Sequence, residues 1–299
     1  MLEKALKIKT YLILNYYFCK DTFPIYNLRE KMKKKSTINV EKVNDLIVNW
    51  LRTYAEKAKS NGFVIGISGG VDSAVTSTLC AQTGLNVLCI EMPIHQAESQ
   101  VNRGKEHIEQ LKLRFKNVSN VEVNLSSVYD SFKTEMPKFE DEIKYNLALA
   151  NTRARLRMAT LYYFAGIKSH LVVGTGNKVE DFGVGFYTKY GDGGVDLSPI
   201  ADLMKSDVYA LGNYLKIPNS ILIASPTDGL FGDSRTDEDQ LGASYDELEW
   251  AMLEVEKGSD LASFSGRDKI VFEIYTKLNK INSHKMKAIP VCSIPENLR

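Results

Sequence analysis

Two adjacent glycines, two serines and one aspartate fall within a run of eight residues that could bind phosphate. The run is Gly66-Ile67-Ser68-Gly69-Gly70-Val71-Asp72-Ser73. It follows the apolar residues 63–65, typical of a buried strand, and precedes residues 74–79, typical of a helix. Glycines let the backbone tighten at such a turn, and the free amides at a helix N-terminus attract anions. The run is therefore predicted to hold the phosphates of a nucleotide.

Asp72 stands where the lysine of a P-loop would be, because no G-K-[ST] sequence follows these glycines. A carboxylate beside a polyphosphate is repulsive unless a cation lies between them, so Asp72 predicts a bound Mg²⁺. The alternative is an ordinary glycine-rich turn in which Asp72 only caps a helix.

Glu180 is the candidate for a second metal ligand. It lies a few residues beyond the apolar run 171–173, in a segment that begins with Gly174-Thr175-Gly176. Two carboxylates from opposing loops would hold one hard divalent cation, with phosphate oxygens and water as further ligands. Taken alone, Glu180 is more typical of a solvated surface acid. The glycine-rich residues 189–196 likewise allow two interpretations, a simple turn or a loop that closes over a polar ligand.

Strands and helices alternate along the chain and would position these loops. Apolar runs predict strands at residues 63–65, 87–90, 121–125 and 171–173, and helical periodicity predicts helices at 38–59, 96–115 and 141–167. This alternation predicts an α/β fold with a doubly wound parallel sheet flanked by helices. If the strand order is 3-2-1-4-5, the first and fourth strands are neighbours and both loops open into one crevice.

The last hundred residues are predicted to be mainly helical. Residues 178–199 are predicted to form a long loop, helices are predicted at 205–216, 240–256 and 266–281, and an irregular tail follows. The main domain is predicted to span 32–299, and residues 1–31 an N-terminal extension or an over-extended reading frame.

Composition narrows the class of protein. The chain has 299 residues and a formal net charge of +1, which argues against a nucleic-acid binder that relies on phosphate neutralisation. The apolar residues 11–18 are too short to span a bilayer, so no membrane attachment is predicted. The four cysteines have no metal-binding spacing, and nothing requires an oxidising compartment, so a cytoplasmic protein is predicted.

The glycine run resembles the pyrophosphate-binding loop, S-G-G-x-D-S, of the N-type ATP pyrophosphatases. This resemblance implies the adenine-nucleotide alpha-hydrolase-like fold and cleavage of ATP between its α- and β-phosphates. A second resemblance is narrower, because residues 174–180, 188–194 and Asp196 are similar to the G-T-x-x-x-x-E…TKYGDGG…D signature of NAD synthetases. It covers roughly residues 38–290 and points to the ammonia-dependent branch, since no length remains for a glutaminase domain. Glu180 and Lys189 are one residue further apart than in some family members.

The resemblance implies a role for each matching residue. Gly66, Ile67, Ser68, Gly69, Gly70, Val71, Asp72 and Ser73 would bind ATP phosphates, together with Thr175, Lys205 and Thr227. Asp72 and Glu180 would hold Mg²⁺, and these two with Lys205 would be catalytic. Deamido-NAD would contact Arg155, Lys189, Asp196, His284 and Lys285.

The three arginines at 153, 155 and 157 cannot all grip one ligand. On a helix, Arg153 and Arg157 share a face, and Arg155 points to the opposite side. Either Arg155 binds an anion while the other two are solvated, or the reverse holds. A solvated basic face is the third possibility. His284 and Lys285 would by default belong to a solvated tail.

The reaction that the resemblance implies is the ATP-dependent amidation of deamido-NAD with ammonia, through an adenylated nicotinate, by a homodimer. Its substrates would be ATP, deamido-NAD and ammonia, with Mg²⁺ as cofactor. Two other functions stay open on the glycine run alone. One is another ATP pyrophosphatase such as a tRNA-thiolating enzyme, and the other is a non-catalytic adenine-nucleotide-binding module.

Overall fold

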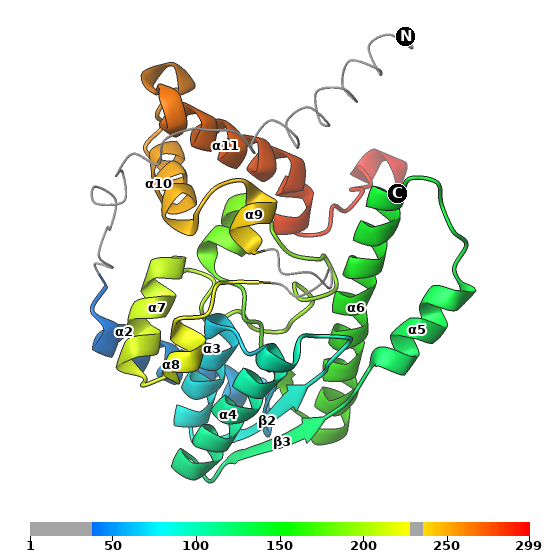
Figure 1. Cartoon of the computed structure of the whole chain (residues 1–299), viewed down its shortest axis with the longest axis vertical. Coiled ribbons are helices and arrows are strands. Elements are labelled where there is room, and N and C mark those ends of the chain that lie inside the picture. Colours follow the sequence, from blue (N-terminus) through cyan, green and yellow to red (C-terminus); the bar gives the residue numbers. More distant parts are fainter. Residues whose placement is uncertain (1–37, 228–235) are drawn as a thin grey trace. The chain divides into compact units, whose positions relative to one another are not determined.

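A parallel sheet of four strands forms the centre of the computed structural model, which describes residues 38–227 and 236–299 (Figure 1). The strands are β1 (Gly62–Gly66), β2 (Asn86–Glu91), β3 (Val118–Glu122) and β4 (Leu171–Val172). Their order is β3-β2-β1-β4, which confirms that β1 and β4 are neighbours. Beyond β4, Leu197 makes a single parallel bridge to Val173, within the segment that was predicted to be a loop.

Strand β1 is apolar along both faces, as a parallel strand covered by helices on both sides requires. In β1, Phe63, Val64 and Ile65 are all fully buried. Phe63 and Ile65 belong to one hydrophobic cluster, and Val64 belongs to another. Because side chains alternate along a strand, these two clusters lie on opposite faces of the sheet.

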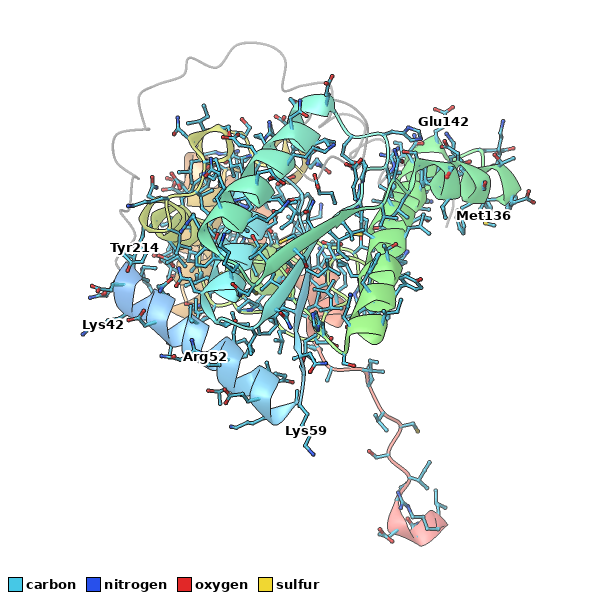
Figure 2. All side chains as sticks on the ribbon, turned by 90° about the horizontal axis from the view of Figure 1, so that it is seen from below. Lys42, Arg52, Lys59, Met136, Glu142 and Tyr214 are labelled. Atoms are coloured by element: carbon cyan, nitrogen blue, oxygen red, sulfur yellow. The ribbon has the colours of Figure 1, made fainter. Side chains whose placement is uncertain are left out.

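Helices cover the two faces unequally. The first cluster holds side chains of α2 (Val40–Lys57), α3 (Val71–Gln82), α4 (Glu98–Arg114) and α7 (Lys205–Tyr214). The second holds side chains of α5 (Ser126–Glu135) and α6 (Glu142–Lys168). Figure 2 shows α2, with Lys42 and Arg52 labelled, and α6, which begins at Glu142, on opposite sides of the strands. The fold is therefore a helix–sheet–helix sandwich.

A third hydrophobic cluster is mainly helical. It joins a π-helix, η2 (Val179–Val184), to α10 (Tyr245–Glu256) and α11 (Gly266–Met286), with Leu241 of α9 (Asp237–Leu241). The remaining short helices are α8 (Asn219–Leu222), η3 (Leu261–Ser263) and η4 (Glu296–Leu298). This helical C-terminal part confirms the prediction and places α10 and α11 against the segment that carries Glu180.

Four local predictions differ from the structure. The third strand lies at Val118–Glu122 rather than 121–125, and helix α5 was not predicted. The predicted loop 178–199 begins with the π-helix η2, whose i→i+5 hydrogen bonds span one residue more than those of an α-helix. Helix α11 continues to Met286, so His284 and Lys285 lie in its last turn rather than in a tail.

The predicted N-terminal extension, residues 1–31, lies outside the described residues. Among the helices of residues 38–227 and 236–299, none combines the length and the apolar character that a bilayer-crossing segment needs.

Candidate active site

The glycine-rich run forms the connection from β1 to α3, as predicted. Gly69 has φ +79°, and a Cβ there would lie 2.4 Å from the carbonyl oxygen of Gln100 in α4. Only glycine fits this position without a shift of backbone. Ser73 stabilises the turn through two hydrogen bonds. Its hydroxyl accepts from the amide of Ser68 at 3.3 Å and donates to the carbonyl of Gly70 at 3.0 Å.

Three charged side chains meet at the carboxyl ends of β1 and β4. The ammonium of Lys205, at the start of α7, lies 2.6 Å from Oδ2 of Asp72 and 3.0 Å from Oε1 of Glu180. The N-cap of α3 is Gly70, and the carboxylate of Asp72 binds Lys205 and Asn177. Asp72 therefore serves the cleft rather than capping a helix, and Glu180 is not a solvated surface acid.

The cluster places one cation between two carboxylates. The side chain of Lys205 is 4% exposed. Burial alone would lower its pKa, but the carboxylates of Asp72 and Glu180 outweigh burial and raise the pKa above its ordinary value. The ammonium stays charged at any physiological pH, and the two acids face a permanent positive charge.

Asn177 ties the two acid-bearing segments together. Its side chain is fully buried. Its Nδ2 donates to Oδ1 of Asp72 at 3.1 Å, and its Oδ1 accepts from the amide of Glu180 at 3.2 Å. Sequence reasoning passed over this residue, although its place three positions before Glu180 and its amide side chain are the signals that could have identified it.

One pocket of about 300 Å³ lies over this cluster. The predicted metal ligand Glu180 lines it, together with residues predicted to bind ATP: Gly66, Ile67, Ser68, Gly69, Gly70, Val71, Asp72, Thr175, Lys205 and Thr227. Ser73 is the one predicted ATP-binding residue that does not. The structure thus brings together residues from four separate segments at the crevice that the strand order predicted.

The pocket wall also contains charged residues that sequence reasoning did not assign. They are Glu91, Arg103, Arg157, Asp181, Asp192 and Asp237. Asp181 follows Glu180 in the π-helix and lies against Gly176, where a Cβ would be 2.1 Å from its Oδ2. Burial, together with the neighbouring carboxylate of Glu180, raises the pKa of Asp181 to about 8.

Most residues predicted to contact the dinucleotide form a second, connected group. Arg155 donates to the carbonyl of Lys189 at 3.3 Å, and the ammonium of Lys189 donates to the carbonyl of His284 at 3.0 Å. The ammonium of Lys285 donates to the carbonyls of Gly185 and Tyr187. None of the four basic residues lines the pocket, but the segment they hold contributes Phe186, Gly191 and Asp192 to its wall.

Asp196 lies apart from that group. Its Oδ2 accepts from the amide of Val172 at 2.8 Å, and its Oδ1 accepts from the hydroxyl of Tyr162 at 2.9 Å. In this structure the carboxylate fastens the segment beyond β4 to the end of helix α6.

The three arginines of α6 diverge as the helix geometry predicted. Arg157 lines the pocket and donates to the carbonyl of Met92 at 3.1 Å. Arg153 stacks on the ring of Tyr129, with 4.7 Å from its guanidinium carbon to the ring centroid. Arg155 points to the segment at Lys189 instead.

Comparisons with known proteins agree with this geometry. The model of the family described as NAD synthase matches residues 43–289. The NH(3)-dependent NAD(+) synthetase of Carboxydothermus hydrogenoformans is 35% identical over 236 residues, which is 77% of this chain and 92% of that protein. The solved structure of NMN synthetase from Francisella tularensis is 29% identical, with a TM-score of 0.73 over 86% of this chain and all of the other. An NH3-dependent NAD synthetase from Campylobacter jejuni shares the fold, with a TM-score of 0.69 at 24% identity over 86% of this chain and all of that chain. A family match over most of the chain, with a pocket built from the segments that carry the signature, shows that the chain belongs to the NAD synthase family.

Proposed function

We propose that this protein is an ammonia-dependent NAD synthetase, a ligase that amidates deamido-NAD at the expense of ATP and releases AMP and pyrophosphate. The observation that carries the proposal is that the glycine-rich turn, Asp72, Glu180 and Lys205 line the same pocket. Membership of the NAD synthase family favours this function over a tRNA-thiolating enzyme or a non-catalytic nucleotide-binding module.

The glycine-rich turn is the proposed site of the β- and γ-phosphates. It supplies backbone amides at the N-terminus of α3, and the dipole of that helix favours negative charge there. Lys205 and Thr175 line the same pocket from the other side. Asp72 and Glu180 hold the ammonium of Lys205 in this pocket. Its positive charge would neutralise negative charge on the phosphates of ATP.

The two carboxylates fit a divalent cation. Asp72 and Glu180 already converge on one positive group, the ammonium of Lys205, and oxygen ligands are those that Mg²⁺ prefers. Within residues 38–227 and 236–299, no group of three metal-binding side chains occurs, so phosphate oxygens and water would complete the coordination. Bound there, Mg²⁺ would supply neutralisation of the charge that grows on the departing pyrophosphate.

The chemistry is two successive displacements. An oxygen of the nicotinate carboxylate attacks the α-phosphorus of ATP, and the bond from that phosphorus to the bridging oxygen breaks, which releases pyrophosphate. Ammonia then attacks the carbonyl carbon of the acyl-adenylate, loses a proton and displaces AMP. The amides of the glycine-rich turn and Lys205 stabilise the leaving phosphates. No nucleophile from the protein is required.

The basic group at the rim of the pocket is the proposed site of deamido-NAD. Arg155, Lys189 and Lys285 carry positive charge that suits the diphosphate of a dinucleotide. Arg155 and Lys285 contact the segment from Gly185 to Lys189, and Lys189 itself contacts the carbonyl of His284. Asp196 is bonded to the hydroxyl of Tyr162, so its proposed role is to hold the segment beyond β4 in place. It would contact deamido-NAD only if this hydrogen bond broke.

A second candidate substrate is the corresponding mononucleotide, nicotinate mononucleotide. The observation that favours it is the likeness to a structure named an NMN synthetase, with a TM-score of 0.73. Both acids carry the same nicotinate carboxylate, so the pocket over Asp72 and Lys205 would serve either one.

The test is an assay with ATP, Mg²⁺ and each acid in turn, with ammonium or glutamine as the nitrogen donor. We expect AMP and NAD to form in equal amounts with deamido-NAD and ammonium. Greater turnover with the mononucleotide would identify that acid as the substrate, and the proposed reaction steps would stay the same. Pyrophosphate release with tRNA instead, or none with any acid, would overturn the proposal. Assembly as a homodimer and location in the cytoplasm stay predictions, and light scattering of the purified protein tests the first.

A further inference from the structure

Tyr245, the first residue of α10, contacts both Glu180 and Lys205. Its hydroxyl donates to Oε1 of Glu180 at 2.5 Å. The ammonium of Lys205 lies over the face of its ring, 4.6 Å from the centroid. The side chain is 5% exposed. Sequence reasoning assigned no role to this residue, which is 65 positions from Glu180.

We propose that Tyr245 is a positioning residue for the metal–phosphate site, with its hydroxyl fixing the carboxylate of Glu180 and its ring fixing the ammonium of Lys205. The inference rests on the proposed function, because it assumes that Glu180 is a ligand of Mg²⁺ and that Lys205 faces ATP.

The hydroxyl restricts how Glu180 can act. Tyr245 and Lys205 both contact the same oxygen, Oε1. A carboxylate has two oxygens, so contacts confined to one of them set the direction in which the other oxygen points. Without the hydroxyl, the side chain of Glu180 would regain rotamers that aim it away from Asp72.

Glu180 also has a competitor for this hydroxyl. Oδ2 of Asp237, at the start of α9, lies 3.2 Å from the same oxygen of Tyr245. A phenol has a single proton to donate, and the shorter contact to Glu180 identifies its acceptor in this structure. Asp237 is therefore a second acid of the pocket wall within reach of this hydroxyl.

Helix α10 holds the neighbouring backbone as well as these side chains. One turn after Tyr245, the carboxylate of Glu249 accepts from the amide of Ser206 at 2.8 Å and from its hydroxyl at 2.7 Å. Ser206 follows Lys205 in α7. On one face of α10, Glu249 fixes the start of α7 and Tyr245 fixes Glu180. A rigid helix thus holds both parts of the site in place.

The test measures ATP binding by calorimetry as a function of Mg²⁺ concentration, in the full-length protein and without deamido-NAD. Tyr245→Phe keeps the ring and removes the hydroxyl, so we expect the Mg²⁺ concentration for half-maximal ATP binding to rise about tenfold, as loss of a hydrogen bond to a charged group predicts. Metal-free ATP binding should stay near that of the wild type. Tyr245→Leu removes the ring too, and we expect it to weaken metal-free ATP binding as well.

Two controls separate positioning from a general loss of structure. Tyr275→Phe removes the hydroxyl of another buried tyrosine in the same helical cluster, which does not line the pocket, and should leave the Mg²⁺ dependence unchanged. In a Glu180→Gln background, Tyr245→Phe should shift the Mg²⁺ dependence no further, since Tyr245 acts through Glu180. An unchanged Mg²⁺ dependence in Tyr245→Phe, or a full second shift in the double variant, would overturn the proposal. Failure to turn over deamido-NAD, with these shifts intact, would count only against the proposed function.

Discussion

The ammonium of Lys205 lies 2.6 Å from Oδ2 of Asp72, although 133 positions separate the two residues in the chain. Asp72 belongs to the helix after β1, and Lys205 begins the helix that packs beside it on the same face of the sheet. Each residue is held by a different segment, so their contact depends on the packing of α3 against α7. Glu180 approaches the same ammonium from the far side of the crevice.

Neutralising Asp72 should abolish most of the activity. Asp72→Asn keeps the shape of the side chain. It removes one of the two carboxylates that contact the ammonium of Lys205 and that would hold Mg²⁺. We expect kcat for NAD formation to fall by about two to three orders of magnitude, the scale of losing one preorganised electrostatic contact. The matched control is Asp130→Asn, because Asp130 pairs with His95 at the surface, with its side chain 55% exposed. Turnover of Asp72→Asn close to that of the wild type would contradict the metal–phosphate assignment.

Removing the ammonium of Lys205 should make folding depend on divalent cations. In Lys205→Met the carboxylates of Asp72 and Glu180 would face each other in a buried site without a positive charge between them. The two negative charges repel each other, and a bound Mg²⁺ would replace the missing ammonium of Lys205. We expect the Tm of this variant to fall in EDTA and to recover as Mg²⁺ is added. The Tm of the wild type should respond far less, and equal responses would show that the two acids do not hold the cation.

Much of this site could be predicted from sequence because its residues lie at strand ends. The glycine-rich turn and Glu180 follow β1 and β4, and parallel strands bring their carboxyl ends to one edge. Asn177 also follows β4 and could have been identified in the same way, whereas Tyr245 could not. The role of Tyr245 depends on which helix packs against η2, and helical periodicity gives no partner. The π-helix was missed for a related reason, since a glycine-rich segment of low periodicity resembles a loop until a helix such as α11 covers it.

Glycine at position 69 should be essential for both stability and ATP binding. Gly69→Ala would place a Cβ 2.4 Å from the carbonyl oxygen of Gln100, at a residue whose φ is +79°. We expect a loss of about 1–3 kcal/mol in the free energy of unfolding, from backbone strain, and weaker ATP binding because the amides of the turn shift.

Gly166 in α6 provides the matched control, because a Cβ there meets nothing within 4 Å. Gly166→Ala should raise the free energy of unfolding by about 0.5–1 kcal/mol, since alanine costs less backbone entropy in a helix. Urea unfolding of both variants measures the two changes. Equal effects from the two substitutions would show that the turn has no special backbone requirement.

His107 should make the protein lose stability in mild acid. Its ring, 1% exposed, shares a hydrogen bond of 2.8 Å with the hydroxyl of Ser77, between α4 and α3. Burial, with a smaller contribution from Arg114, lowers the pKa of His107 to about 4. Between pH 6.5 and 4 the unfolded chain therefore binds a proton at this residue that the folded chain does not, so stability falls as the pH falls. The contribution is about 3 kcal/mol over that interval, at 1.36 kcal/mol per pKa unit. His107→Gln cannot take up this proton and should flatten the curve of unfolding free energy against pH. Urea unfolding of the wild type and the variant at several pH values between 7 and 4 measures the two curves, and an unaltered slope in His107→Gln would mean that other buried groups cause the acid sensitivity.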